Sequence, residues 1–220
     1  MRRLVPHLGL LAVAWLVMTG AVGACNLFRP AIPERGGGGV IVPTNYTDPD
    51  STLATLARGV GSKADGRDAY MGGIADPIRD ARSFEATFDP AVLARYNSQP
   101  GALPVPSPWS TKEEGTFFSS FSQYKTTPYA MVWGPDNNNP IDDKTGDPRV
   151  IHRSYQVTTQ LSGATLIIAV GFADLTFTQT PSGRWVILRW ADRVDPAFGG
   201  ANPSNPEQVP LGWRRLTLPR

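Results

Sequence analysis

Hydrophobic positions along the chain follow two different periods, and the change between them falls near Pro128. Before this point, apolar residues recur three and four positions apart, as on one face of a helix. Such stripes run over residues 51–75, in two parts, and over residues 110–124. After Pro128, apolar and polar residues alternate, which is typical of strands. The pattern therefore predicts helices in the first half of the folded region and strands in the second.

Two short helices are predicted from the first stripe, with Asp50 or Ser51 as the N-cap of the first helix. Residues 84–96 predict a short strand followed by a turn or half-helix. The third helix begins at Ser110, where a capping box lets the serine hydroxyl and the Glu113 carboxylate satisfy amides of the first turn. The apolar face of the first helix consists of Leu53, Leu56, Ala57 and Val60.

Four strands are predicted after Pro128, over residues 129–133, 150–161, 165–180 and 184–192. The third is longer than one flat strand usually runs, so we expect a bend with a bulge at Gly171. The fourth carries large apolar residues on both faces, which indicates a central strand that is covered on both sides. The loop 134–143 contains three acids, but their spacing does not match a calcium loop, so we expect a hydrated hairpin loop.

The N-terminal segment has the features of an export signal. Arg2 and Arg3 precede an apolar run over residues 8–22, and small residues then lead to Cys25, the single cysteine. The run is shorter than the roughly 20 residues that span a bilayer as a helix. The sequence Val22-Gly23-Ala24-Cys25 resembles the lipobox of bacterial lipoproteins, which implies that Cys25 is acylated and becomes the first residue after cleavage. The competing interpretations are a transmembrane anchor and an ordinary signal peptide followed by a plain thiol.

Glycine and proline divide the remaining chain into segments. Residues 25–49 contain a run of four glycines and several prolines, which predicts a lipidated flexible tether. We therefore expect a signal peptide over 1–24, this tether, a folded domain over 50–196 and an irregular tail over 197–220. Within the tail, Trp213 is expected to pack on the domain or on a partner, with Arg214 at the rim together with Arg215 and Arg220.

Charge and composition exclude several kinds of site. The chain has 21 basic and 19 acidic side chains, and removal of the signal takes away Arg2 and Arg3, which leaves the two signs equal. A basic surface for nucleic acid is therefore not expected. His152 is the sole histidine after residue 24, so the common zinc sites with two histidines are excluded. We predict no metal site and no cofactor.

The order of elements is that of an α+β domain, with N-terminal helices packed on a strongly bent antiparallel sheet. Two further features are the phenylalanines after Trp109-Ser110-Thr111-Lys112-Glu113-Glu114 and the hairpin over residues 183–192. In these features and in the order of its elements, the chain resembles the cone-shaped family of nuclear transport factor 2-like, or SnoaL-like, domains. The resemblance covers about residues 50–195. It implies a cone-like α+β barrel with a pocket between the helices and the concave face of the sheet.

The resemblance leaves the function open, because this fold carries both enzymes and binding domains. Enzymes that resemble ketosteroid isomerase use a tyrosine and carboxylates of shifted acidity in an apolar pocket. The side chains that could serve here as catalytic groups are Tyr70, His152, Asp174 and Asp192. The aromatic residues expected to line the pocket are Phe117, Phe121, Trp133, Tyr155 and Trp190.

Two functions of different classes follow from these features. The first is a lipid-anchored cell-envelope protein that binds a small apolar ligand or an envelope protein and has no catalysis of its own. The second is a cofactor-independent isomerase or dehydratase that uses tyrosine, aspartate and histidine as acids and bases. In both cases the expected partner of acylated Cys25 is the lipid bilayer. Asn26, in place of an aspartate, favours the outer membrane or the periplasmic face in a host with two membranes.

Overall fold

The computed structural model describes residues 42–62, 66–100, 103–124, 127–139, 141–195 and 210–215. The described residues belong to one compact unit, Val40–Arg220. The signal peptide and Cys25 lie outside the described residues, so these assignments stay predictions. In the part of the chain that the structure describes, no helix is both long and apolar enough to cross a membrane.

The tether prediction needs a correction at its C-terminal end, where residues 42–48 contact the domain. The amide of Trp185 donates to the carbonyl of Tyr46 over 2.8 Å, and the Tyr46 hydroxyl donates to the carbonyl of Ala69 over 2.9 Å. The Asn45 amide bonds the Thr55 hydroxyl over 3.0 Å. The Tyr46 carbonyl accepts one of these bonds and its hydroxyl donates another. The bonds attach the segment to the domain, although its amino-acid composition is typical of a flexible linker.

Helix α2, Pro49–Gly61, starts two residues earlier than predicted. Its N-cap is Asp48, whose carboxylate accepts from the Ser51 amide over 2.8 Å, and not Asp50 or Ser51. Pro49 explains the shift, because proline fits the first helical position, where its missing N–H costs nothing. The predicted apolar face is confirmed, since three of its residues are buried: Leu53, Leu56 and Val60.

Loss of the Asp48 cap is expected to cost about 1 kcal/mol of stability in the Asp48→Ala variant. The Ser51 hydroxyl and amide bind the Asp48 carboxylate, which lowers its pKa. A lowered pKa means that the stabilisation exists at neutral pH and is lost as the pH falls through the folded-state pKa. Urea unfolding at pH 7 and at pH 3 measures both effects. Glu85→Ala, at an exposed position, is the control and should change stability by less than about 0.5 kcal/mol.

Helix α3, Gly66–Gly72, packs across α2 through two glycines. A Cβ atom on Gly66 would lie only 2.0 Å from the carbonyl oxygen of Gly59. The two helices approach each other so closely because neither glycine has a side chain. This contact places Tyr70, which follows on α3, in the interior of the domain, where it is fully buried.

The middle of the chain forms short elements before the third long helix. They are β1, α4, β2 and α5, with bounds Glu85–Thr87, Pro90–Asn97, Trp109–Ser110 and Thr111–Tyr124. The predicted capping box at the start of α5 is confirmed: the Ser110 amide donates to the Glu113 carboxylate over 3.0 Å, and the Ser110 hydroxyl accepts from the Lys112 amide over 3.2 Å. The predicted half-helix near residue 90 is the eight-residue helix α4.

The last four strands form the predicted antiparallel meander, and their bounds are Tyr129–Pro135 for β3, Arg149–Leu161 for β4, Ala164–Gln179 for β5 and Trp185–Val194 for β6. The strand order of the whole sheet is β2-β1-β6-β5-β4-β3. The sheet is mixed and not purely antiparallel, because β1 pairs with β6 in parallel. No hairpin joins these two strands, so their directions are not forced to oppose each other.

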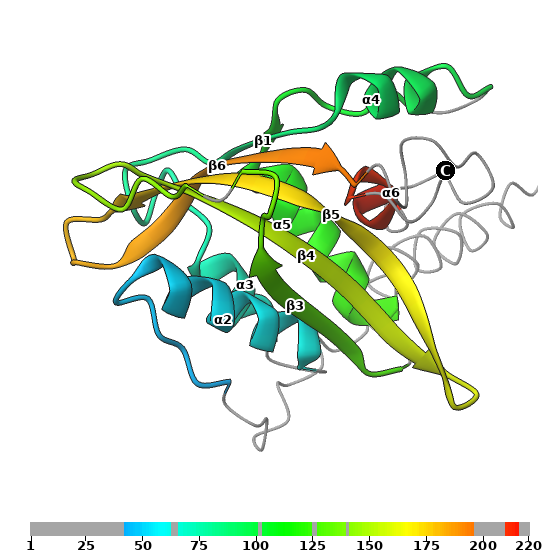
Figure 1. Ribbon diagram of the computed structural model, residues 1–220, viewed down its shortest axis with the longest axis horizontal. Coiled ribbons are helices and arrows are strands. Elements are labelled where there is room, and N and C mark those ends of the chain that lie inside the picture. The colour runs from blue at the N-terminus through cyan, green and yellow to red at the C-terminus, as the bar shows by residue number, and fades with distance from the viewer. Residues whose placement is uncertain are drawn as a thin grey trace, which may run out of the picture. The chain divides into compact units, whose positions relative to one another are not determined.

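Bulges occur in β5 and β6, but not at Gly171 as predicted. Gly171 pairs regularly with Tyr155, whereas the register shifts where β5 passes Ile168 and where β6 passes Leu188. A bulge of this kind needs one unpaired residue but does not need the conformational freedom of glycine. The position of Gly171 therefore did not predict the position of the bulge. Figure 1 shows β4 and β5 as long curved strands, which is the bend that the length of β5 predicts.

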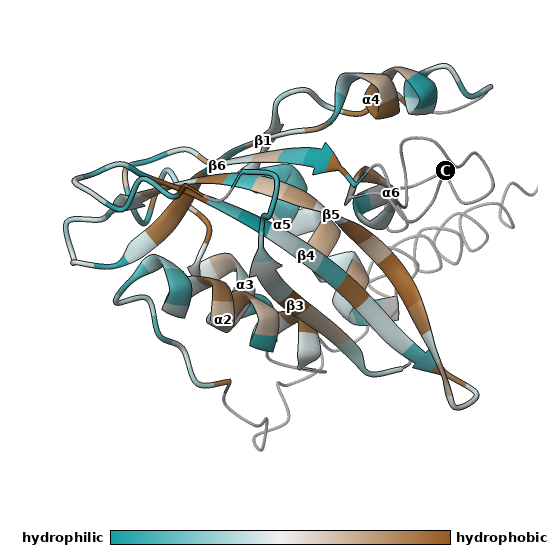
Figure 2. Ribbon diagram, viewed as in Figure 1, coloured by the Kyte–Doolittle hydropathy of each residue, from teal (hydrophilic) through white to brown (hydrophobic). Residues whose placement is uncertain are grey.

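Helices α2, α3 and α5 lie on one face of the curved sheet (Figure 1). Burial alternates along the second half of β5, as expected for a strand with one face against a core, whereas β6 begins with three consecutive buried residues. Figure 2 shows hydrophobic, brown runs on both strands. The indole N–H of Trp133 on β3 donates to the Leu53 carbonyl on α2 over 3.0 Å, which joins the edge of the sheet to the helical layer. The predicted fold class is therefore confirmed: an α+β domain in which N-terminal helices pack on a bent sheet.

Candidate functional site

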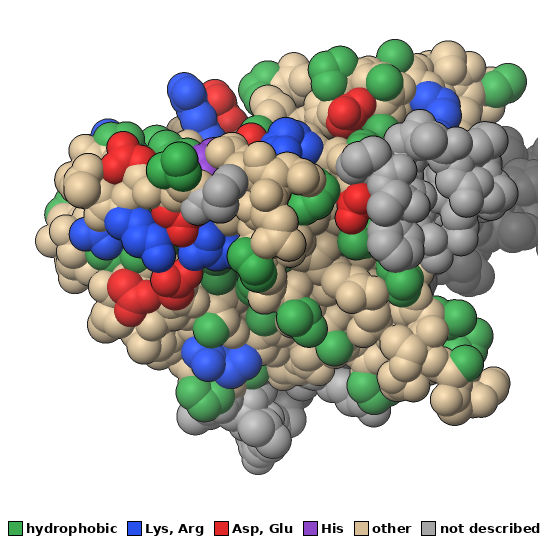
Figure 3. All heavy atoms as spheres, in the orientation of Figure 1, with side chains coloured by type: hydrophobic (Ala, Val, Ile, Leu, Met, Phe, Trp, Pro, Cys, Tyr) green, Lys and Arg blue, Asp and Glu red, His purple; other side chains and the backbone are tan. Residues whose placement is uncertain are grey.

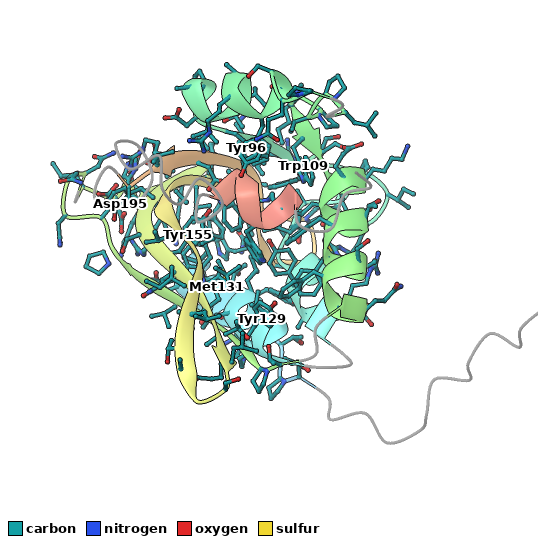
Figure 4. The ribbon with its side chains drawn as sticks, turned by 90° about the vertical axis from the view of Figure 1, so that its right-hand side faces the viewer. Tyr96, Trp109, Tyr129, Met131, Tyr155 and Asp195 are labelled. Atoms are coloured by element: carbon teal, nitrogen blue, oxygen red, sulfur yellow. The ribbon has the colours of Figure 1, made fainter. Side chains whose placement is uncertain are left out.

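A short C-terminal helix, α6 (Pro210–Arg215), places the side chains of Leu211, Trp213 and Arg214 inside the domain. It contacts β5, β6 and α5, and Figure 4 shows it between the strands and α5. Trp213 and Arg214 are both fully buried. The prediction that Trp213 packs on the domain is therefore confirmed, and the prediction that Arg214 lies at the rim is wrong. Arg214 is buried because two carboxylates in the interior bind it.

The guanidinium of Arg214 bridges Glu114 on α5 and Asp192 on β6. Its Nη1 atom lies 2.8 Å from Asp192 Oδ2. Its Nε and Nη2 atoms lie 3.0 and 3.2 Å from the two carboxylate oxygens of Glu114. The contact with Glu114 is thus bidentate, a geometry that the planar fork of arginine forms and lysine does not.

Four further donors hold these two carboxylates. Tyr70 and Trp109 each donate to Glu114 over 2.6 Å. Asp192 Oδ1 accepts from the Tyr155 hydroxyl over 2.8 Å and from the Trp190 indole over 2.7 Å. Figure 4 labels Trp109 and Tyr155, which lie on either side of α6 in that view. We call the residues that surround the guanidinium through these bonds the arginine cage: Tyr70, Trp109, Glu114, Tyr155, Trp190 and Asp192.

Aromatic rings complete the surroundings of the charge. The Cζ atom of Arg214 lies 4.7 Å from the centre of the Trp190 ring and 5.6 Å from that of Phe88. Ring faces at such distances attract a cation through their quadrupole. The site therefore combines carboxylates, neutral donors that orient them, and aromatic walls, all of which favour a planar cation.

Burial and charge shift the acidities of the cage in a consistent way. Burial raises the pKa of Asp192 to about 6, against the lowering effect of Arg214. Burial alone would lower the pKa of Arg214, but Glu114 and Asp192 more than offset this and raise it well above its ordinary value. Burial, and then the nearby carboxylates, raise the pKa of Tyr70 and Tyr155 well above 10.0. At neutral pH both tyrosines are therefore donors and Arg214 is charged.

Asp192 is expected to make the domain less stable as the pH rises through its titration. The folded state binds this proton below about pH 6, whereas an aspartate in the unfolded chain has its ordinary pKa of 3.8. Between these values the folded state holds more protons, so stability falls with rising pH, by about 2 kcal/mol between pH 4.5 and 7. Asp192→Asn should remove this fall, which urea unfolding at several pH values measures.

A control for this titration is Asp174→Asn on the other face of the sheet. Partial burial would raise the pKa of the Asp174 carboxylate, but Arg193 and His152 bind it and lower this pKa below its ordinary value, in the direction opposite to that of Asp192. The Asp174→Asn variant should therefore keep the fall in stability of the parent protein. An Asp192→Asn variant with the parent's pH dependence would contradict the assignment of this titration to Asp192.

The four catalytic candidates separate into two places. Tyr70 and Asp192 both belong to the arginine cage, although they contact different ends of the guanidinium. His152 and Asp174 bind each other over 2.7 Å on the opposite face of the sheet, because His152 and Tyr155 are three residues apart on one strand. The candidates therefore do not form one site.

The outer pair is part of a network of ion pairs. Arg193 binds Asp174 over 2.8 Å and also contacts the buried carboxylate of Asp136 in the loop before β4. Arg153 binds Asp142 of the same loop over 2.9 Å. The predicted hydrated hairpin is thus partly a buried ion-pair loop. Figure 3 shows basic and acidic side chains intermixed at one side of the face that it draws.

Metal ligands do not cluster in the described part of the chain. There, no group of three or more histidine, cysteine, aspartate or glutamate side chains could hold a metal ion. In the 134–143 loop, Asp136 and Asp142 bind arginines, and Asp143 accepts hydrogen bonds from Thr145. The acids of the arginine cage likewise bind a guanidinium. Neither set of carboxylates resembles the coordination shell of a metal ion.

The five aromatic residues expected to line a pocket form two groups. Phe117 and Phe121 contact the Trp213 ring edge-on, at centroid distances of 4.9 and 5.8 Å. The rings of Trp133, Tyr155 and Trp190 contact one another at 5.4 to 5.7 Å. Trp190 lies beside the Arg214 guanidinium, whereas Trp133 is half-buried and is the one of the five that lines an open groove, the one between α2 and β3.

Open grooves lie outside this interior. One, of about 760 Å³, runs between α2 and the edge strand β3, and another, of about 550 Å³, between α3 and α5. A hollow of only about 10 Å³ lies beside Asp192, between Phe88 and Leu211 of α6. A ligand of ordinary size could therefore reach the arginine cage through this hollow only if α6 moved away.

Glu114 and Arg214 were not predicted as site residues from the sequence. Glu114 shares a helical face with Phe117, Phe118 and Phe121, so the period of α5 already places a carboxylate among buried rings. An acid in such a stripe calls for a cation elsewhere in the chain. Arg214 directly follows Trp213, the residue predicted to dock on the domain. This position was the signal that Arg214 could be the cation that binds Glu114.

Sequence comparison gives no relative. No protein-family model matches the chain. No curated protein matches it in sequence either.

Solved structures show distant similarity. The chain is similar to a variant of Rv3472, a protein of unknown function from Mycobacterium tuberculosis, with a TM-score of 0.49 at 12% identity over 76% of this chain and 85% of that chain. For ActVI-ORFA from Streptomyces coelicolor the TM-score is 0.45 at 9% identity, over 66% and 92%. For the beta subunit of a putative aromatic-ring-hydroxylating dioxygenase from Novosphingobium aromaticivorans it is 0.42 at 14% identity, over 66% and 86%. These similarities are too distant to indicate an activity.

Proposed function

We propose that the chain is a lipid-anchored protein of the cell envelope whose folded domain binds a partner and catalyses no reaction of its own. The observation that supports a binding domain is the arginine cage, in which both buried carboxylates and all four neutral donors are engaged around one guanidinium. A set of oriented acceptors around a cation is the arrangement of a recognition site.

Acid–base catalysis is less well supported by the same geometry. A general base must reach a substrate proton within hydrogen-bond distance. Asp192 has a pKa near 6, which would suit a base, but Arg214, Tyr155 and Trp190 bind its two oxygens. His152 lies on the opposite face and cannot assist it. For this reason we favour binding over the isomerase or dehydratase alternative.

The anchor is the second part of the proposal. Cys25 follows the lipobox-like residues Val22-Gly23-Ala24, and the glycine-rich segment after it would hold the domain away from the bilayer surface. Acylation of one cysteine with more than one chain gives stable attachment to a membrane. The envelope location, at the outer membrane or the periplasmic face in a host with two membranes, follows from this anchor.

The Cys25→Ser variant tests the anchor. We expect it to leave the membrane fraction almost completely, whereas the parent protein stays there, because serine offers no thiol for acylation. Fractionation followed by immunoblotting and intact-mass measurement distinguishes the forms. Retention of Cys25→Ser in the membrane at the mass of the uncleaved chain would instead indicate a transmembrane segment.

The binding function has its own test. The anchored protein can be purified from its native envelope after crosslinking and compared with a Trp213→Ala variant, in which α6 loses its buried ring. A partner or ligand that binds in the interior around α6 should co-purify in different amounts with the parent protein and with the Trp213→Ala variant, as measured by mass spectrometry. Turnover of a substrate by the purified protein, abolished by Asp192→Asn, would refute the non-catalytic part of the proposal.

A further inference from the structure

The two carboxylates of the arginine cage are also held by four bonds that do not involve Arg214. Tyr70 on α3 and Trp109 on β2 hold Glu114, while Tyr155 on β4 and Trp190 on β6 hold Asp192. All four donors are more than nine-tenths buried. The acceptors are therefore oriented by the body of the domain before any guanidinium arrives, which is the property of a preorganised site.

The occupant supplied by the chain itself is held by a small element. Helix α6 has six residues, and a helix of this length has no stability of its own in water. The indole Nε1 atom of Trp213 is buried and has no hydrogen-bond partner in the described part of the chain. A buried donor without a partner opposes the docking of α6. The bound helix is thus a less than optimal ligand for a well-formed site.

We propose that the arginine cage is an exchangeable guanidinium-binding site, and that α6 occupies it as an internal substitute for an arginine-bearing ligand. This inference rests on the proposed binding function and names its ligand class. The ligand would present a guanidinium to Glu114 and Asp192 after α6 has left. The bidentate contact with Glu114 and the ring of Trp190 over the charge select a planar cation against an ammonium ion.

The form of the internal occupant indicates a peptide as the ligand. Arg214 enters the interior together with its neighbour Trp213, whose ring contacts Phe117 and Phe121. A partner segment with an aromatic residue directly before an arginine would reproduce both contacts. A small guanidinium compound would reproduce only the charged contact, so the two sources are distinguishable by experiment.

The first experiment uses the full chain with the Arg214→Ala substitution, in which the cage lacks its cation. Methylguanidinium should raise the thermal unfolding midpoint of this variant in a saturable way, and methylammonium should not. A matched variant that carries both Glu114→Gln and Arg214→Ala should lose the response. Absence of a response to methylguanidinium, or an equal response to methylammonium, would overturn the proposal.

The second experiment needs only the parent protein and so does not depend on the folding of a variant. Hydrogen exchange at the α6 amides, followed by mass spectrometry, reports the release of this helix. A synthetic peptide with the sequence of residues 210–215 should accelerate this exchange by displacing α6, and the peptide with Arg214→Ala should be at least about tenfold less effective, given the strength of charged hydrogen bonds. Equal effects of the two peptides, or no effect of either, would overturn exchange at this site.

The comparison of probes identifies the source of the ligand. Acceleration by the peptide alone indicates an arginine-bearing partner chain, whereas equal acceleration by methylguanidinium indicates a small compound, and both outcomes support a guanidinium site. These measurements use purified protein and do not depend on the anchor. If they fail while Cys25→Ser still leaves the membrane, the anchor proposal stands and the guanidinium inference falls.

Discussion

Replacement of Arg214 by alanine should lower the free energy of unfolding by about 3–5 kcal/mol, because removal of one partner leaves buried charge uncompensated. Arg214 is fully buried and binds two carboxylates that are also buried. Without it, Glu114 and Asp192 must either remain charged in the interior or take up protons. Urea unfolding at pH 7, followed by circular dichroism, measures the loss.

The control for this prediction is Arg189→Ala. Arg189 also belongs to the C-terminal part of the chain, but its side chain is 70% exposed and its nearest carboxylate oxygen, on Glu85, is 3.9 Å away. Exposed pairs of this kind contribute little, so the change should stay below about 1 kcal/mol. Similar losses for the two variants would mean that Arg214 is not in the interior in solution. The loss for Arg214→Ala should also become smaller toward pH 4.5, where Asp192 takes up a proton.

Trp213→Ala should cost a similar amount, about 3–5 kcal/mol, through packing and not through charge. The ring is fully buried against Phe117 and Phe121, so its removal leaves a cavity between α6 and α5. The same unfolding experiment measures this loss, and hydrogen exchange of the α6 amides should increase with it.

The matched variant for the packing prediction is Trp213→Phe. Phenylalanine keeps an aromatic ring but removes the indole N–H, which has no partner in the described part of the chain. The loss of ring volume and the removal of the unsatisfied donor oppose each other, so the net cost should be clearly smaller than for alanine. A Trp213→Phe variant as unstable as Trp213→Ala would show that the indole N–H has a partner in solution.

The helices and the meander could be predicted from the sequence because both depend on local periodicity. Leu53, Leu56 and Val60 define a helical face without reference to any other segment, and the alternation of Trp190 and Asp192 on one face of β6 follows from the geometry of a strand. The parallel pairing of β1 with β6 could not be read in this way. It joins residues about a hundred positions apart, and neither strand records the direction of its neighbour.

The arginine cage shows the same limit for the site. Tyr70 and Asp192 were predicted as candidate catalytic groups, and both contribute to the cage. Glu114 and Arg214 pair across the interior from positions a hundred residues apart. The helical period of α5 indicates that Glu114 is buried, but it does not identify the cation that compensates its charge. Only the packed structure shows that this cation is Arg214.

Buried ion pairs of this kind are weak evidence for stability, because desolvation offsets most of the attraction. Well-packed apolar side chains in place of all three charged residues, Glu114, Asp192 and Arg214, would serve stability at least as well. The cost of keeping two carboxylates, two tyrosines and two indoles around one cation is easier to understand if the cage also recognises a ligand. This is the physical reason for treating α6 as an occupant and not only as part of the core.

A double-mutant cycle between Glu114 and Arg214 tests the central claim most directly. The two single variants, Glu114→Gln and Arg214→Ala, and the double variant are compared by urea unfolding at pH 7. If the guanidinium binds Glu114 in the interior as described, the interaction energy of the cycle should be about 2–3 kcal/mol, in the range of residues that share one buried network. Additive effects, with an interaction energy below about 0.5 kcal/mol, would contradict the arginine cage and the inference built on it.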